Sequence, residues 1–192
     1  MTPKRALDIF LGVPAAIFAT PVVGLLALLV VISSGWPPFL VQTRVGADER
    51  PIRVLKFRTM RRGTPTLAKA ELLRSDLARA RSLYTPLGPL MRHLSLDELP
   101  QIYHVIEGTM SLVGPRPALP SQHDLLALRR RAGVTALKPG LSGLAQIKGR
   151  EALTLATKVR LEKHYLRHAS IALDLSIIAR TLPALLSRRG AF

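Results

Sequence analysis

The sequence predicts an α+β fold that is mostly helical, with a kinked, re-entrant membrane helix at the N-terminus, a small β-hairpin and interfacial amphipathic helices. Three observations support this fold class. Residues 6–32 are apolar except for Asp8. Residues 39–45 and 52–60 have the β-branched and aromatic composition of strands and flank a polar loop. Most of the remaining chain has helical spacing interrupted by glycine and proline.

The apolar run is long enough to cross a bilayer. At about 1.5 Å per residue it would reach roughly 40 Å, against a hydrocarbon core of about 30 Å. Pro14 and Pro21 each remove a backbone donor and favour a kink, and the Thr20 hydroxyl can bond to a freed carbonyl. Basic residues flank both ends, so the positive-inside rule gives no orientation. A plain span and a helix that bends at Thr20–Pro21 and leaves by the same face both stay open. In the second case residues 1–35 are embedded in the membrane and residues 36–192 form an interfacial domain.

Further helical segments follow along the rest of the chain. We expect Gly108 to end one of them, because glycine commonly follows the last helical residue. The final segment has long apolar stretches with sparse charges, so we expect it to lie in the interface or pack on the domain. The predicted helices are 68–84, 90–96, 100–108, 123–133, 151–168 and 170–190.

The composition of the chain limits the classes of partner and of functional site that it could have. A net charge of +16 favours an anionic partner: nucleic acid, acidic lipid or a phosphorylated substrate. Aromatic residues make up only 5 %, which is few for a protein that stacks single-stranded bases. Cysteine is absent, which excludes disulfides, thiolate catalysis and cysteine-based zinc sites.

Two short basic motifs could bind phosphate. Lys56 and Arg58 alternate in the second predicted strand, so they share one face and form a two-cation patch. A solvated strand edge is the alternative. Arg116 lies between prolines in the stretch GPRP, which restricts its backbone and suits bidentate phosphate binding, with a surface turn as the alternative.

The adjacent acids Asp97 and Glu98 stand out in a basic chain. Ser95 and Glu98 have the spacing of a capping box, so the acids could simply begin a helix. Alternatively Pro100 is the first helical residue, and both acids lie just before a helix N-terminus that can bind phosphate. Neighbouring residues diverge by about 100° on a helix. The two carboxylates would therefore serve different groups.

Seven motifs occur in a fixed order over most of residues 4–151. They are KRALDIF, Thr20–Pro21, FLVQTRVG, KFRTM, SLDELPQ, MSLVGPRP and PGLSGLAQIKGR. In this combination the chain resembles the monotopic bacterial phosphoglycosyl transferases of the bacterial sugar transferase family. Thr20–Pro21 stands where that family usually has Ser-Pro at the break of a re-entrant helix, so the resemblance favours the re-entrant alternative.

The resemblance implies a sugar-phosphate transferase that uses Mg²⁺ and a UDP-sugar. An aspartate attacks the sugar-linked phosphate, UMP leaves, and polyprenyl (undecaprenyl) phosphate then takes the phosphosugar from the enzyme. This is the first membrane step of glycan and glycoconjugate biosynthesis, on the cytoplasmic face of the bacterial inner membrane. Anionic lipids would attract the basic domain.

The family's roles fall on matching residues of this chain. Asp97 is the nucleophile and contacts Mg²⁺, and Glu98 assists with the metal or with deprotonation of the acceptor. Lys56, Arg58 and Arg116 bind phosphates, and Arg150 in KGR is a further candidate.

The chain departs from the family at four positions. His104 stands where asparagine is common, Thr109 replaces aspartate, Leu144 replaces tryptophan and Lys148 replaces asparagine. These departures concern sugar specificity, packing and nucleotide contacts, and leave the reaction class intact.

Two other functions stay open on sequence alone. One is a membrane-anchored binder of anionic ligands without catalysis, and the other is an inactive scaffold of a glycan-assembly complex. We expect no nucleic-acid partner. The sugar, the polyprenol and the oligomeric state are open, a homodimer included.

Overall fold

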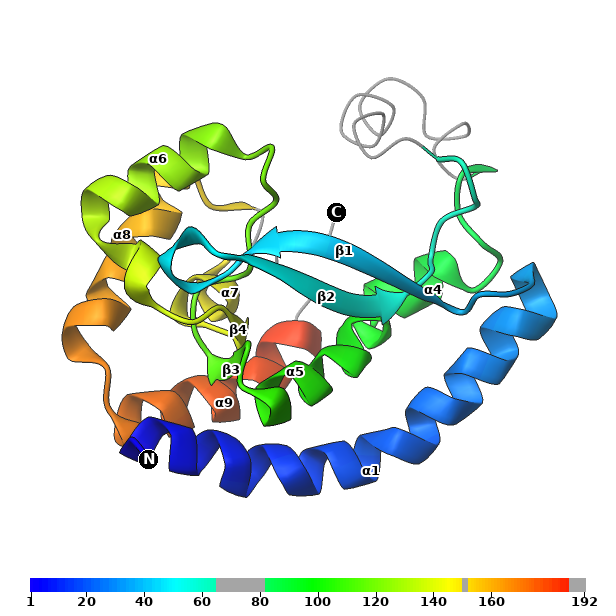
Figure 1. Ribbon diagram of the computed structural model, residues 1–192, viewed down its shortest axis with the longest axis horizontal. Coiled ribbons are helices and arrows are strands. Elements are labelled where there is room, and N and C mark those ends of the chain that lie inside the picture. Colours follow the sequence, from blue (N-terminus) through cyan, green and yellow to red (C-terminus); the bar gives the residue numbers. More distant parts are fainter. Residues whose placement is uncertain (65–81, 150–151, 187–192) are drawn as a thin grey trace. The chain divides into compact units, whose positions relative to one another are not determined.

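The computed structural model describes residues 1–64, 82–149 and 152–186, and this part of the chain is mostly helical, as predicted (Figure 1). Its α-helices are α1 (Pro3–Ser34), α4 (Gly88–His93), α5 (Ile102–Glu107), α6 (His123–Ala132), α7 (Leu144–Lys148), α8 (Leu155–His168) and α9 (Ile171–Leu186). Its strands are β1 (Phe39–Val45), β2 (Pro51–Phe57), β3 (Ser111–Val113) and β4 (Gly140–Ser142). Short 3₁₀ helices are η1 (Ala47–Glu49), η2 (Leu96–Gln101) and η3 (Val134–Ala136). The helix predicted over 68–84 lies mostly outside the described residues.

The strands form two small sheets. β1 and β2 pair as the predicted hairpin. β3 and β4 form a parallel pair, with Ser111 opposite Gly140 and Val113 opposite Ser142. The sequence did not predict this second sheet, because three-residue strands beside glycine and proline have no alternating pattern long enough to detect.

The chain divides into two compact units. The first unit comprises Met1–Phe18, Gln42–Val54 and Gln101–Phe192, and the second comprises Ala19–Val41 and Leu55–Pro100. Helix α1 and the hairpin contribute residues to both. This division follows packing, whereas the predicted boundary at residue 35 concerns the membrane, so that boundary stays a prediction.

Helix α1 suits a membrane by length and composition. Among the described helices it is the one that passes both criteria, and only 17 % of its most apolar stretch is buried, unlike the core helix of a soluble protein. Phe10 and Phe18 are 75 % and 78 % exposed. The helix continues through Pro14 and Pro21. The predicted re-entry at Thr20–Pro21 stays a prediction.

One face of the first half of α1 is packed against the first unit. Asp8, Gly12 and Ala16 are buried and lie four residues apart, so they share one side of the helix. Gly12 permits close approach, since a Cβ atom there would lie 3.4 Å from a methyl group of Val105. This half of the helix therefore has a docked stripe and an exposed apolar side.

Charged groups fix the N-terminal end of α1 to α8 and α9. Lys4 Nζ donates to Asp174 Oδ2 at 2.8 Å and to the Tyr165 hydroxyl at 3.0 Å. That hydroxyl donates to Asp174 Oδ1 at 2.6 Å. Burial, together with the hydrogen bond to Asp174, raises the pKa of Tyr165, so the hydroxyl stays protonated and remains a donor.

Two more residues of α1 bind backbone groups of the first unit. The Arg5 guanidinium donates to the carbonyls of Val105 and Ile106, near the end of α5. Asp8 Oδ1 accepts from the Ser111 hydroxyl and from the Leu112 amide, each at 3.0 Å. The helix thus joins both α5 and β3 through polar contacts far apart in sequence.

The first unit has its core around the β3–β4 pair. Val113, Tyr165 and Ile177 form one buried cluster that joins β3 to α8 and α9. A second cluster includes Leu126 of α6 and Val159 of α8. Gly108 and Gly133 have positive φ values of 96° and 72° and end α5 and α6, which confirms the predicted stop at Gly108.

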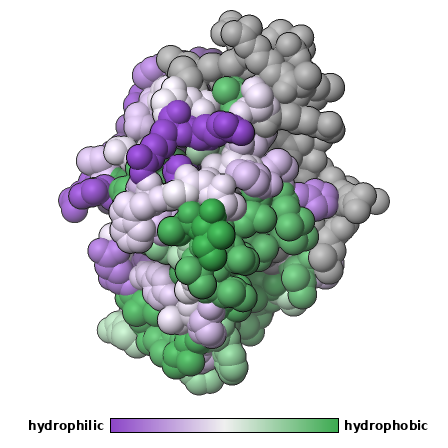
Figure 2. Space-filling model, turned by 90° about the vertical axis from the view of Figure 1, so that its right-hand side faces the viewer, coloured by the Kyte–Doolittle hydropathy of each residue, from purple (hydrophilic) through white to green (hydrophobic). Residues whose placement is uncertain are grey.

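The second unit has a separate core. Val23 and Val30 of α1 pack with Phe57 of β2 and Met91 of α4. The two valines are seven residues apart, about two helical turns, so they lie on the same side of α1. The outer residues of this helical half are apolar, and Figure 2 shows hydrophobic side chains gathered on the molecule's face at this end of α1.

Arg58 follows β2, and its side chain binds backbone carbonyls at and just after the C-terminal end of α1. Its Nε donates to Pro37 O at 2.9 Å, and its Nη2 donates to Ser34 O at 2.9 Å, to Ser34 Oγ at 3.2 Å and to Gly35 O. The last carbonyls of a helix have no partner within it, so a buried guanidinium satisfies several of them at once. Burial also lowers the pKa of Arg58.

Arg58→Met should destabilise the protein by about 2 kcal/mol, because the partly buried hydrogen bonds from its charged guanidinium to the carbonyls of Ser34, Gly35 and Pro37 are lost. The measurement is the thermal unfolding midpoint in detergent, with Lys56→Met as the neighbouring control. An unchanged midpoint for Arg58→Met, with a raised KM for the donor substrate alone, would show that Arg58 binds phosphate and has no capping role.

Candidate functional site

The acidic pair lies on the 3₁₀ helix η2. Such a helix repeats every three residues, so Leu96 and Leu99 lie on the same side, and both pack on the core of the second unit. Asp97 and Glu98 take the other two sides, about 120° apart. Asp97 is 9 % exposed and Glu98 is partly exposed. Two leucines therefore fix the turn that presents two diverging carboxylates.

The structure agrees with the first sequence alternative in one respect, because a helix begins directly after Ser95 and has both acids in its first turn, although it is the 3₁₀ helix η2. The second alternative, with Pro100 as the first helical residue, is wrong. Ser95 has a left-handed φ of 56°, whereas a capping residue has extended backbone. The Glu98 amide donates to the Ser95 carbonyl at 3.3 Å. Pro100 lies inside η2, and α5 begins at Ile102. A tight 3₁₀ turn replaces the expected α-helical start because, in an α-helix, the Pro100 ring would clash with the carbonyl of Leu96, four residues earlier.

The predicted cations Lys56 and Arg58 belong to the same unit as the acids. They flank Phe57, which is fully buried in the cluster that also receives Leu96 and Leu99. One hydrophobic cluster thus anchors both the basic and the acidic segment. Lys56 is partly buried and Arg58 is 8 % exposed.

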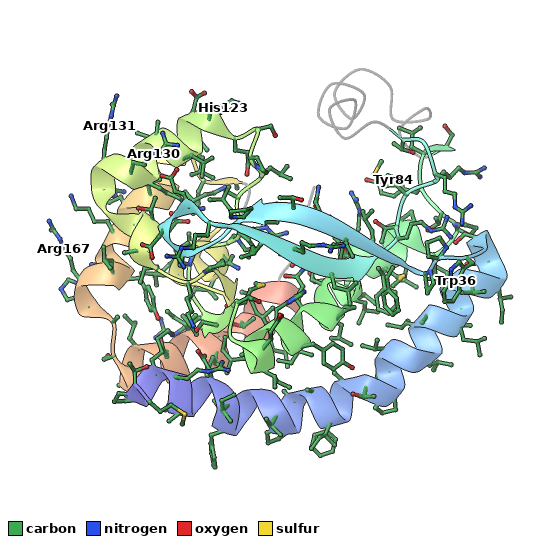
Figure 3. All side chains as sticks on the ribbon, in the orientation of Figure 1. Trp36, Tyr84, His123, Arg130, Arg131 and Arg167 are labelled. Carbon is green, nitrogen blue, oxygen red and sulfur yellow. The ribbon has the colours of Figure 1, made fainter. Side chains whose placement is uncertain are left out.

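Sequence reasoning missed Arg92 in the second unit. Its Nε donates to Thr59 Oγ1 at 2.8 Å, and its guanidinium lies 5.1 Å from the ring centre of Tyr84, which Figure 3 labels. Arg92 is on α4, five residues before Asp97. The segment LMRH has no periodic pattern that would have singled this residue out.

Of the other two predicted cations, the structure describes Arg116 alone. Arg116 is in the first unit, where it is exposed while Gly114, Pro115, Pro117 and Ala118 around it are buried. Arg150 lies outside the described residues. The combination of these two arginines with the acidic pair stays a prediction.

The acidic pair fits a metal that arrives with substrate. Within the described ranges, no three histidine, aspartate or glutamate side chains come together as metal ligands. Mg²⁺ commonly binds through one or two carboxylates, with substrate phosphates and water completing its shell. Asp97 and Glu98 offer that donor set.

Two of the departures from the family pattern meet in space. His104 Nδ1 lies 3.0 Å from Glu107 Oε2, and the Thr109 hydroxyl donates to the same oxygen at 3.4 Å. Leu144 packs beside the cluster of Val113, Tyr165 and Ile177, so it has a packing role. Lys148 is exposed at the end of α7.

Comparison with known proteins agrees with the motifs. The sequence pattern of the family described as bacterial sugar transferase matches residues 1–188. The chain is 36 % identical to the exopolysaccharide production protein ExoY of Sinorhizobium fredii, with 98 % of this chain and 88 % of the relative aligned. It is 34 % identical to the UDP-glucose:undecaprenyl-phosphate glucose-1-phosphate transferase of Caulobacter vibrioides, over 98 % of this chain and 72 % of the relative.

A longer relative contains a region similar to the whole chain. The undecaprenyl-phosphate glucose phosphotransferase of Komagataeibacter xylinus is 36 % identical over 100 % of this chain, which covers 37 % of that protein. The family match and these identities extend over nearly all of the sequence. The chain therefore belongs to the bacterial sugar transferase family, which confirms both the resemblance and the expectation of an enzyme.

Proposed function

We propose that the protein transfers a sugar 1-phosphate from a UDP-sugar to undecaprenyl phosphate, at the cytoplasmic face of the bacterial inner membrane. Family membership and the names of the relatives support this reaction class. The observation that carries the proposal is the Asp97–Glu98 turn. It holds two carboxylates beside a basic segment in a protein of net charge +16.

Asp97 acts as the nucleophile in the proposed first step. One carboxylate oxygen forms a bond to the phosphorus that carries the sugar, the bond from that phosphorus to the UMP oxygen breaks, and UMP leaves with its electron pair. An oxygen of undecaprenyl phosphate then attacks the same phosphorus and releases Asp97. The product is undecaprenyl diphosphate sugar, and the carboxylate is regenerated.

Glu98 has a separate task because it faces another direction. On a 3₁₀ turn its carboxylate diverges from that of Asp97, so the two cannot easily attack the same atom. We assign Glu98 to holding Mg²⁺ or to accepting a proton from the acceptor phosphate. Bound Mg²⁺ would neutralise charge on the diphosphate, as metal ions do in other phosphoryl transfers.

The basic residues of the second unit would offset substrate charge. The oxygens that Arg58 binds are neutral carbonyls and a hydroxyl, so they satisfy its N–H groups without cancelling its charge. Lys56 adds a second positive charge two residues away. Phosphoryl transfer depends mainly on positioning and on such charge neutralisation.

The contacts of α1 support a monotopic, re-entrant topology. Lys4, Arg5 and Asp8 bind residues of the first unit that lie about a hundred positions or more further along the chain than they do. If α1 crossed the bilayer, its N-terminal end would lie on the opposite side from those residues. We propose that the helix instead bends at Thr20–Pro21 and returns to the same face.

The last helix supports contact with the membrane surface. On α9 the exposed apolar residues Ile171, Leu175 and Leu182 are spaced by four and seven positions, so they share one side. This spacing suits a helix lying in the interface, and the net positive charge suits anionic lipids.

Asp97→Asn should lower UMP release by about a thousandfold or more, because an amide oxygen is a far weaker nucleophile than a carboxylate. The assay uses detergent-solubilised protein, Mg²⁺, undecaprenyl phosphate and a panel of UDP-glucose, UDP-galactose and UDP-N-acetylhexosamines. The matched control is Asp124→Asn, the same change at an exposed position of α6, which should keep wild-type activity. Equal UMP release from Asp97→Asn and wild type would rule out the proposed nucleophile.

The natural absence of cysteine permits a direct test of topology. Single-cysteine variants Thr2→Cys and Arg50→Cys should both resist a membrane-impermeant maleimide in intact spheroplasts, and both should react in inverted vesicles. Labelling of Thr2→Cys from outside, with Arg50→Cys protected, would establish a plain span and exclude re-entry.

A further inference from the structure

The stretch Gly114–Ala118 in the first unit is held by its backbone. Four successive carbonyl oxygens, from Pro115 to Ala118, each accept a hydrogen bond from a different residue. In order, the donors are the Gly140 amide, the Arg129 guanidinium, the Arg44 guanidinium and the Val45 amide, at 2.9, 3.0, 3.0 and 2.9 Å. This stretch therefore has little freedom to rotate its peptide groups.

Two prolines and a closely packed glycine restrict the backbone of this stretch further. Pro115 and Pro117 restrict φ on both sides of Arg116. A Cβ atom on Gly114 would lie 2.2 Å from the Lys138 carbonyl oxygen, so the strand β4 segment packs directly on the backbone there. Of residues 114–118, Arg116 is the one that is exposed, so the rigid loop presents the Arg116 side chain to solvent.

The donor to the carbonyl of Arg116 is a buried side chain. Arg129 of α6 and Glu162 of α8 are 5 % and 3 % exposed. Arg129 Nε donates to Glu162 Oε2 at 2.8 Å, and Nη2 donates to Glu162 Oε1 at 2.5 Å. The same Nη2 donates to Arg116 O at 3.0 Å. Glu162 thus fixes the plane of a guanidinium that in turn fixes the peptide of Arg116.

Stability alone is a weak reason for this arrangement. The desolvation cost of a buried ion pair offsets most of its attraction, and apolar residues of similar volume often replace such a pair without loss of stability. A bidentate pair whose Nη2 also donates to a loop carbonyl instead offers orientation.

We propose that Arg129 and Glu162 are positioning residues that hold Arg116 in the geometry needed to bind a substrate phosphate. The inference rests on the proposed function, with Arg116 in the phosphate-binding role that the resemblance to the family implies. A displacement of about 1 Å at a positioned group can cost on the order of a hundredfold in rate. The pair would therefore affect turnover through Arg116 without touching substrate.

The test is a double-mutant cycle on UMP release. Arg129→Met/Glu162→Leu replaces the pair by apolar side chains and removes the donor to Arg116 O. It should lower kcat/KM for the best UDP-sugar of the panel by about 10- to 100-fold, with a thermal midpoint near that of wild type. Added to Arg116→Ala, the same two changes should cause no further loss.

The matched control is the ion pair that the neighbouring arginine of α6 makes with η1. Arg130 of α6, labelled in Figure 3, donates to Glu49 at 2.5 Å, and among the described residues it makes no hydrogen bond to the loop. Arg130→Met/Glu49→Leu should keep kcat/KM within about twofold of wild type, since exposed pairs contribute little.

Two results would overturn the positioning role. One is wild-type kcat/KM in Arg129→Met/Glu162→Leu, and the other is an equal loss with and without Arg116→Ala. If the double variant does not fold, Arg129→Lys replaces it, because one ammonium group keeps the charge but cannot hold both carboxylate oxygens and the carbonyl. Full activity of Arg116→Ala would also overturn this proposal while leaving the role of Asp97 intact. The proposed function is tested separately, because it fails if Asp97→Asn stays active.

Discussion

Buried carboxylates hold the N-terminal end of helix α1 to the other elements of the first unit. Asp8 and Asp174 are 4 % and 2 % exposed, and each is satisfied by partners on a different element. Removing such partners would leave a buried carboxylate uncompensated, which costs several kcal/mol. Separating the first half of α1 from the rest of the first unit would therefore lower the stability of the protein by several kcal/mol. The proposed topology, the proposed membrane surface of α9 and the proposed location of the chemistry all depend on this attachment.

An enzyme placed at such a surface has a water-soluble donor and a lipid acceptor that need not bind at the same time. A covalent phosphosugar on the protein would separate the two encounters, and a carboxylate on a rigid turn suits that task. The turn is rigid because Leu96 and Leu99 pack on the core that also buries Phe57. The same core thus supports the acids through Leu96 and Leu99, and it supports Lys56 and Arg58 through Phe57, which lies between them in sequence.

Local signals in the sequence predicted the features that depend on local physics. The long apolar helix, the β1–β2 hairpin and the stop at Gly108 follow from composition, alternation and backbone preference. The β3–β4 pair, the capping of α1 by Arg58 and the hold of Arg129 on Arg116 depend on residues brought together from distant positions, which no local pattern encodes. At the acidic pair, Asp97 and Glu98 stay predicted site residues, and the expected α-helical start is instead a 3₁₀ helix with Pro100 inside it.

The most direct measurement of the central claim is the mass of the peptide that contains Asp97. The protein would be incubated with Mg²⁺ and the active UDP-sugar in the absence of undecaprenyl phosphate, then digested and analysed by mass spectrometry. The account predicts a sugar-phosphate adduct on Asp97 that disappears when undecaprenyl phosphate is added. Formation of the lipid product at a normal rate with no adduct on Asp97 at any time would contradict it, and would indicate direct transfer between the two substrates.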